Sequence, residues 1–332
     1  METLKIADSG IQTSRIGLGT WALGGWKWGG TDDAAGIRTI HAALDRGINL
    51  IDTAPAYGFG HSESIVGQAI AEQGRREDVV LATKVALEWS DDESIMRNAT
   101  PQRIEQEVHD SLKRLQTDYI DIYQIHWPDP LVPVEETATA MNRLYRDGKI
   151  RAIGVSNFSP AQCEAFRQAA PLHCIQPPYN LFEREIEKDI APYAQREGLA
   201  MLTYGALCRG LLTGKMRADT TFTGDDLRNV DPKFQQPRFS QYLKAVQALE
   251  TFARERHDKS MLALAVRWLL DRHPQQGIAL WGARRPDQVA PVDAIDGWHL
   301  SPTDLDDIDA IVTRHVSDPV GPEFMAPPSR EG

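Results

Sequence analysis

Two hydrophobic patterns alternate along the chain. Short apolar runs such as Ile48-Asn49-Leu50-Ile51 are typical of buried strands, and between them apolar residues recur at helical spacing, as at Ile37, Ile40 and Leu44. Two further runs around Ser9-Gly10 predict an initial β-hairpin over residues 3–14. Strands are predicted at 15–19, 48–51, 79–83, 119–125, 150–155, 174–176, 199–203 and 277–280. Helices are predicted at 35–44, 63–73, 101–115, 134–146, from 160, and at 185–197, 242–256, 261–271, from 286, and 302–315.

This alternation predicts an α/β fold with a parallel sheet, because strands that alternate with helices pair in parallel. Eight strands, each followed by a helix, favour a (β/α)8 TIM barrel over a doubly wound sheet. The hairpin would cover one end of the barrel, and extra C-terminal helices would lie outside it. No change of composition marks a linker, so residues 1–332 are expected to form one domain. The irregular segment over residues 205–240 is long enough to indicate a functional or mobile loop.

Composition narrows the classes of partner. The 332 residues carry a formal net charge of -11, which argues against nucleic acid or an anionic membrane as the main partner. Three cysteines in no metal-type spacing suggest free thiols in a reducing cytoplasm. No signal peptide and no apolar run of membrane-spanning length are recognisable, so a cytoplasmic location is expected. The oligomeric state is left open, with a monomer favoured.

Ionisable side chains follow three consecutive predicted strands. Asp52 ends one strand and Tyr57 lies five residues later on a Pro/Gly loop, while Lys84 and His126 follow the next two strands. Each residue has an ordinary alternative: a cap for Asp52, a packed aromatic for Tyr57, a surface lysine and a core histidine. The carboxyl ends of barrel strands meet at one mouth, however, so four such coincidences are improbable. The set predicts a site that delivers a proton to a carbonyl group.

With these residues the chain resembles the aldo-keto reductases, and within them a bacterial subgroup that includes glycerol dehydrogenases and general-stress reductases. The likeness extends in order over nearly the whole chain. It is carried by Gly17-Leu18-Gly19-Thr20-Trp21, Asp52-Thr53-Ala54, Tyr57-Gly58, Thr83-Lys84, Asp121-Ile122-Tyr123-Gln124-Ile125-His126, Gly154-Val155-Ser156-Asn157-Phe158, and the run from Tyr204 through Gly210 to Lys215.

The resemblance implies a role for each of the four residues. Tyr57 would be the general acid that protonates the carbonyl oxygen while a hydride reaches the carbon. Lys84 would lower the pKa of the Tyr57 phenol, and Asp52 would pair with Lys84 and hold its charge. His126 would donate a hydrogen bond to the carbonyl oxygen and orient it.

The resemblance also implies a nicotinamide cofactor. Ser156, Asn157 and Gln176 would bind its carboxamide, and Tyr204 would stack on the ring, although Ser156-Asn157 could also form a turn and Gln176 could belong to a polar loop. Gly205 is assigned to the same site, and Leu207, Arg209 and Lys215 would close over the pyrophosphate. The segment with Gly282, Arg284 and Gln288 would hold a 2′-phosphate at a helix start, which favours NADP(H). Two positions depart from the family pattern there: Trp281 replaces a proline, and Ala290-Pro291-Val292 replace a Glu-Asn pair.

Other motifs in the sequence do not support alternative cofactors. Gly17-Leu18-Gly19 fits a relaxed dinucleotide fingerprint, but the glycines that follow cannot sustain the helix that it needs. Gly210 to Lys215 is one residue short of a P-loop, and no cluster has metal-ligand spacing, so no metal is predicted.

Tryptophans are expected at the mouth, where flat apolar walls would admit small carbonyl compounds with little selectivity. The predicted substrate-binding residues are Trp21, Trp26, Trp89 and Trp127, with Trp28 nearby. At least two of these five tryptophans are expected only to cover the rim of the barrel.

The main hypothesis is therefore an NADPH-dependent oxidoreductase that reduces small aldehydes and ketones such as glyceraldehyde, with reverse polyol oxidation at high pH. The alternatives are a non-enzymatic NADP(H)-binding subunit resembling potassium-channel β-subunits, and a barrel hydrolase or isomerase that uses the same mouth without nicotinamide.

Overall fold

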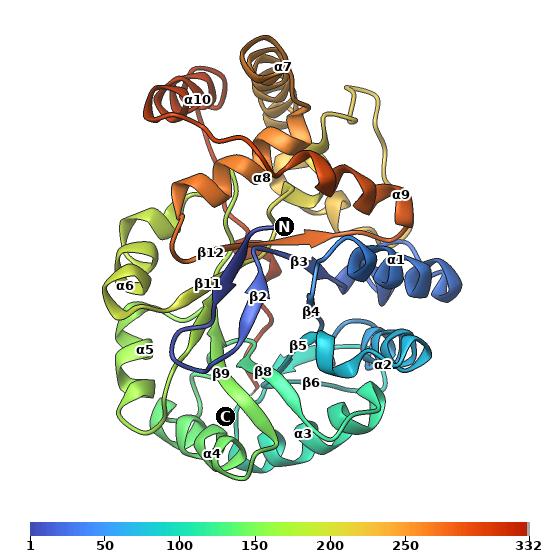
Figure 1. The fold of residues 1–332 in the computed structure, drawn as a ribbon, viewed down its shortest axis with the longest axis vertical. Helices are drawn as coiled ribbons and strands as arrows, with labels where there is room; N and C mark the ends of the chain where they lie inside the picture. The colour runs from blue at the N-terminus through green and yellow to red at the C-terminus, as the bar shows by residue number, and fades with distance from the viewer. Residues whose placement is uncertain (331–332) are drawn as a thin grey trace.

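Eight parallel strands close into a barrel in the computed structural model, which describes residues 1–330 (Figure 1). The predicted (β/α)8 fold is thus confirmed, and the last two residues of the predicted domain lie outside the described part. The strands follow one another in chain order around the barrel. They are β3 (Ile16–Gly19), β4 (Leu50–Asp52), β5 (Val80–Val85), β8 (Ile120–Ile125), β9 (Ile150–Ser156), β10 (Cys174–Gln176), β11 (Ala200–Thr203) and β12 (Gly277–Gly282).

Helices surround this barrel and begin at the capping residues that the sequence offers. Side chains of Asp32, Thr100, Ser159, Ser260 and Ser301 each accept a backbone N–H of the first turn, which satisfies groups that a helix start leaves unpaired. The helices are α1 (Asp33–Asp45), α2 (His61–Gln73), α3 (Pro101–Leu115), α4 (Val134–Arg146), α5 (Pro160–Arg167), α6 (Ile190–Glu197), α7 (Arg238–His257), α8 (Met261–Arg272), α9 (Pro286–Val289) and α10 (Pro302–His315). No helix in residues 1–330 combines the length and apolar character that a membrane crossing requires.

The predicted hairpin is present and closes the amino-terminal end of the barrel. Strands β1 (Thr3–Lys5) and β2 (Gln12–Ser14) pair antiparallel. Ile6 between them is fully buried and packs in the barrel interior with Leu50 and Val80. The opposite end, at the carboxyl ends of the strands, is therefore the open one.

The predicted helix over residues 185–197 is interrupted. A 3-10 turn, Glu185–Lys188, precedes α6, and Asp189 between them accepts the N–H of Ile190 with its side chain. The break places Pro192 in the first turn of α6, where a missing N–H leaves no hydrogen bond unmade.

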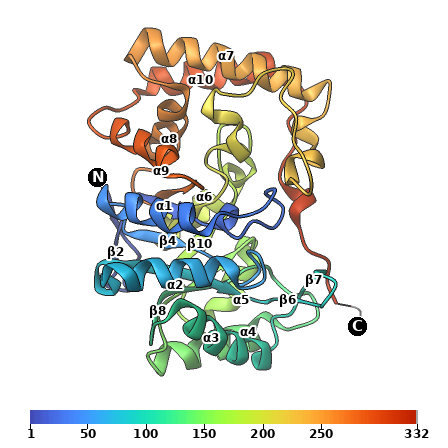
Figure 2. The same cartoon turned by 90° about the vertical axis from the view of Figure 1, so that its right-hand side faces the viewer.

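A second hairpin that the sequence analysis missed lies beside the barrel mouth. Strands β6 (Leu87–Trp89) and β7 (Ile95–Arg97) pair antiparallel around an acidic turn in which Ser94 donates to Asp92. The two apolar pairs that flank this turn were the available signal. Figure 2 shows the segment after α10 running from the outer helices toward this hairpin.

Candidate active site

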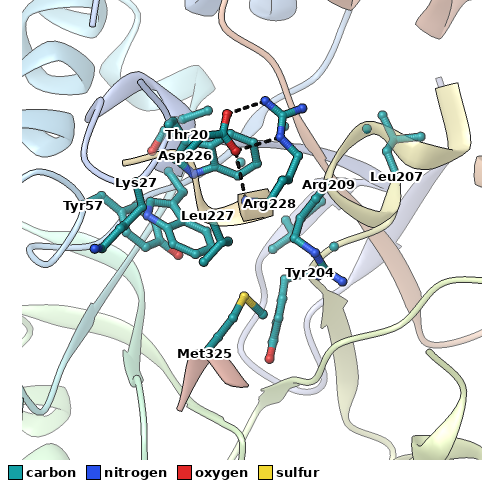
Figure 3. A pocket seen from close by; sticks show the side chains of 18 of the residues that line it. Thr20, Lys27, Tyr57, Tyr204, Leu207, Arg209, Asp226, Leu227, Arg228 and Met325 are labelled. Carbon is teal, nitrogen blue, oxygen red and sulfur yellow. Dashed lines mark hydrogen bonds and ion pairs between the residues drawn. The ribbon is translucent and has the colours of Figure 1, made fainter. Parts of the chain in front are cut away.

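A cavity of about 1010 Å³ occupies the open end of the barrel. It is lined at the strand ends by Gly19, Asp52, Ser156, Gln176 and Gly282, so it collects side chains from strands far apart in the sequence. Figure 3 shows Tyr57, Tyr204, Arg209 and Met325, from three separate segments, around this cavity.

Lys84 lies beneath the cavity and joins the predicted catalytic residues. Its side chain is fully buried, and its Nζ donates to Asp52 Oδ2 at 2.7 Å and to the backbone oxygen of Thr53 at 2.9 Å. A third bond reaches the Tyr57 hydroxyl at 3.2 Å. All three hydrogens of the ammonium therefore have acceptors, and one acceptor is the phenol that faces the cavity.

The electrostatics differ in one respect from the sequence-based expectation. Burial raises the pKa of Tyr57 above its ordinary value, and the opposing effect of Lys84 does not reverse this. Burial alone would lower the pKa of Lys84, but Asp52 and Tyr57 together raise it. Lys84 thus lowers the pKa of Tyr57 as expected, but burial outweighs this effect, so the phenol keeps its proton at neutral pH.

His126 completes the set on the other side of Tyr57. The two rings meet edge to face with centroids 5.8 Å apart. Burial, helped by the charge of Lys84, holds the pKa of His126 well below its usual range. A neutral imidazole can donate one hydrogen bond into the cavity without adding a charge to it.

The predicted carboxamide-binding residues form a connected polar cluster. Ser156 Oγ donates to the backbone oxygen of Gln176, and Asn157 Nδ2 donates to Ser156 Oγ and to the backbone oxygen of His126. The Tyr204 hydroxyl donates to Asn157 Oδ1 at 3.0 Å. These contacts place the four residues together on one wall of the cavity.

Arg209 lines the cavity, and its guanidinium forms two ion pairs with buried carboxylates. It donates to Glu183 and Asp231 while the residue still lines the cavity. Lys215 is exposed and lines the same cavity. Gly205 and Leu207 line the same wall.

The segment after β12 is also tied down by its own contacts. Arg284 donates to the backbone oxygen of Trp28 at 2.7 Å and to that of Gly30, so it bridges to the tryptophan-rich loop. Gln288 Oε1 accepts the backbone N–H groups of Arg284 and Arg285, at the start of the segment predicted to hold the 2′-phosphate. Trp281, at the position of the family's proline, is buried and donates to the Gln288 backbone.

The tryptophans divide into two groups. Trp21 stacks on Tyr57 with centroids 5.8 Å apart, and Trp26, Trp28 and Trp127 also line the cavity. Trp89 does not line it, and its assignment to the substrate site is wrong: on β6 its ring packs against Phe59 and beneath Arg103.

Two segments that line the cavity were not predicted to belong to the site. Asp225 accepts the backbone N–H groups of Lys27 and Gly29, which carries the loop around Leu227 across the cavity. The terminal segment contributes further apolar groups. These are Phe324, Met325, Pro327 and Pro328. The length of the 205–240 loop signalled the first, whereas nothing local signalled the second. Within residues 1–330 no three His, Cys, Asp or Glu side chains come together as a metal site.

Comparisons with known proteins agree with this geometry. A model described as "Aldo/keto reductase family" matches residues 15–313. The chain is 62% identical over 331 residues to "Aldo-keto reductase YhdN" of Bacillus subtilis (strain 168), covering 100% of this chain and 99% of that protein. It is 36% identical over 334 residues to "NADH-specific methylglyoxal reductase" of Escherichia coli (strain K12), covering 96% and 99%. The structure of the glycerol dehydrogenase from Gluconobacter oxydans superposes with a TM-score of 0.88 at 55% identity, covering 98% of this chain and 99% of that one.

Proposed function

The chain belongs to the aldo/keto reductase family, and we propose that it is an NADPH-dependent enzyme that reduces small aldehydes and ketones to alcohols. The observation that carries the proposal is the buried Lys84 ammonium, which bonds Asp52 and the Tyr57 hydroxyl at the floor of a large cavity. This contact supports a role for Tyr57 as the proton donor to a carbonyl compound, with Lys84 as the neighbouring positive charge.

Bound NADPH would supply a hydride to the carbonyl carbon. Tyr57 would transfer its phenolic proton to the carbonyl oxygen, so that an alcohol forms and the phenolate remains. Lys84 would stabilise that phenolate, and Asp52 would balance the charge of Lys84. His126, neutral and facing Tyr57, would donate a hydrogen bond that orients the carbonyl oxygen.

The residues present fit a nicotinamide dinucleotide phosphate. Ser156, Asn157 and Gln176 offer polar groups for a carboxamide, and Tyr204 offers a ring face beside them. Lys215, Arg284 and Arg285 also line the cavity, and their positive charges support a phosphate-bearing cofactor. Gly205, Leu207, Arg209, Gly282 and Gln288 would complete the cofactor site.

The substrate side favours small molecules. Trp21, Trp26 and Trp127 form flat apolar walls next to Tyr57, and we propose glyceraldehyde as a substrate with glycerol-type oxidation as the reverse reaction. The similar structure from Gluconobacter oxydans is described as a glycerol dehydrogenase, which supports this choice.

The test is a comparison of catalytic efficiency with NADPH and with NADH, using DL-glyceraldehyde and methylglyoxal as substrates. We expect NADPH to be preferred. A preference for NADH, as the name of the Escherichia coli relative describes for that protein, would refute the cofactor assignment. Absence of turnover with either cofactor, together with measurable NADPH binding, would favour a non-enzymatic subunit.

We also propose that the chain acts as one domain with a small-molecule partner. Its main hydrophobic core is one cluster of side chains, whose members range along the sequence from Ile16 to Val316. The three cysteines are unpaired and buried, which is compatible with the predicted cytoplasmic location.

A further inference from the structure

Gln124 is a fully buried amide that the mechanism above does not use. It lies on β8 and does not line the cavity. Its Nε2 donates to Asp52 Oδ1 at 3.2 Å, and its Oε1 accepts from Gln176 Nε2 at 3.1 Å. It therefore contacts both the carboxylate that holds Lys84 and the amide that faces the cavity.

These contacts fix the orientation of the Gln176 side chain. Gln176 Nε2 also donates to Asp52 Oδ1, at 2.9 Å, so both hydrogens of its amide nitrogen are used inside the barrel. A carboxylate oxygen can only accept, so the nitrogen must be the atom that points toward Asp52. The Oε1 of Gln176 accepts no hydrogen bond from residues 1–330 and is the one group that this side chain can offer to a ligand.

We propose that Gln124 is a positioning residue that makes Gln176 present a pure hydrogen-bond acceptor to the cavity. The ligand group that matches such an acceptor is the NH2 of a primary carboxamide, so this inference rests on the proposed nicotinamide cofactor. Asp52 alone supplies one anchor, about which an amide can rotate. Asp52 and Gln124 together supply two anchors and fix the plane of the amide.

The test compares two cofactors that differ only at the carboxamide. NADP+ carries the NH2 group, whereas its 3-acetylpyridine analogue carries a methyl ketone that cannot donate. Dissociation constants are measured from quenching of tryptophan fluorescence, because several tryptophans line the cavity. In the unaltered protein the analogue should bind roughly three- to tenfold more weakly, the worth of one net hydrogen bond.

Gln124→Met keeps the length of the side chain but removes both contacts, and the ratio of the two dissociation constants should fall close to one. Gln124→Glu keeps an oxygen that can accept from Gln176 and should preserve the ratio. If Gln124 had only a structural role, Gln124→Glu should change the ratio more than Gln124→Met does, because a buried carboxyl beside Asp52 is the more disruptive change. Gln102→Met, the same substitution on the exposed surface of α3, is the matched control and should leave the ratio unchanged.

An unchanged ratio of the two dissociation constants in Gln124→Met would overturn the proposal, even if both cofactors bind more weakly by the same factor. If circular dichroism shows that Gln124→Met does not fold, Gln124→Glu decides: a preserved ratio supports the assignment and a lost ratio refutes it. Failure of the unaltered protein to bind either cofactor would instead refute the proposed function, so the two failures are distinguishable.

Discussion

Lys84 remains charged although no part of it reaches solvent. Burying an ammonium is costly unless partners compensate, and here Asp52, the Thr53 carbonyl and the Tyr57 hydroxyl occupy its three donors. The same contacts bring the phenol to the cavity floor with its pKa raised by burial. At the residue scale the site thus holds a phenol that stays protonated, next to a cation that would stabilise the phenolate.

Tyr57→Phe removes the hydroxyl while keeping the ring that stacks on Trp21. We expect turnover of DL-glyceraldehyde to fall by a factor on the order of 10²–10⁴, because the variant lacks the hydroxyl that is proposed to deliver the proton. The dissociation constant for NADPH should stay close to that of the unaltered protein. Near-native turnover in this variant would contradict the role assigned to Tyr57.

Lys84→Met changes the pH dependence of alcohol oxidation, the direction that requires the Tyr57 phenolate. A nearby cation favours the phenolate, so its removal raises the pKa of Tyr57 further, and the remaining Asp52 charge acts in the same direction. The alkaline rise of kcat/KM should therefore move to higher pH than in the unaltered enzyme. A profile that stays in place, or moves to lower pH, would show that Lys84 does not act on Tyr57.

At the scale of elements, the terminal segment after α10 lies across the mouth of the barrel. The terminal segment crosses from the outer helices to the β6–β7 hairpin, as Figure 2 shows, and is fastened along its course. Arg97 donates from its side chain to the Pro327 oxygen and from its backbone to the Pro328 oxygen. Arg330 then pairs with the buried carboxylate of Asp129 at 2.8 Å. Phe324 and Met325, which line the cavity, lie just before these attachments.

Arg97→Ala should loosen this terminal segment, because it removes the side-chain bonds to the Pro327 and Pro128 oxygens. We expect faster amide hydrogen exchange over residues 320–330 and a rise in kcat/KM for bulky aldehydes relative to glyceraldehyde. Arg143→Ala, on the exposed face of α4, is the matched control and should change neither measurement. Unaltered exchange in Arg97→Ala would mean that this arginine does not hold the segment.

At the scale of the whole molecule, a buried ionic network joins the cavity wall to the 205–240 loop and the terminal segment. Glu183 accepts from Arg209 and from Lys233, Asp231 accepts from Arg209, and Lys233 also donates to the Gly321 oxygen. Burial alone would raise the pKa of Glu183, but the two cations lower it. This stabilisation is present above the unfolded-state pKa of the carboxyl and is lost as the pH falls through the folded-state value.

Lys233→Met leaves Glu183 with one cation in a fully buried setting. Breaking a buried pair in this way typically costs about 3–5 kcal/mol, so the free energy of unfolding measured with urea should fall by that order. Lys244→Met, on the exposed side of α7, offers the same change without buried partners and should stay within roughly 0.5 kcal/mol of the unaltered protein. Equal stability of the two variants would show that the network contributes little.

The sequence by itself determined the barrel and most of its helix boundaries, because hydrophobic spacing and capping residues act locally. The bounds of α4 and α10 follow directly from such signals. Parallel strands share one open end, so the convergence of Asp52, Lys84 and His126 was also predictable from their places after consecutive strands.

The tertiary structure alone decided what depends on distant contacts. Burial raises the pKa of Tyr57 against the effect of Lys84, and no local pattern gives the balance of the two. The acceptors of Arg209 come from segments before and after it in the chain, and the partner of Trp89 is Phe59 rather than the cavity. The same holds for the terminal segment, whose place over the mouth is set by Arg97 and Asp129, more than 190 residues away in the sequence. Spacing along the chain encodes which residues share an element, but desolvation and pairing across elements depend on the assembled fold.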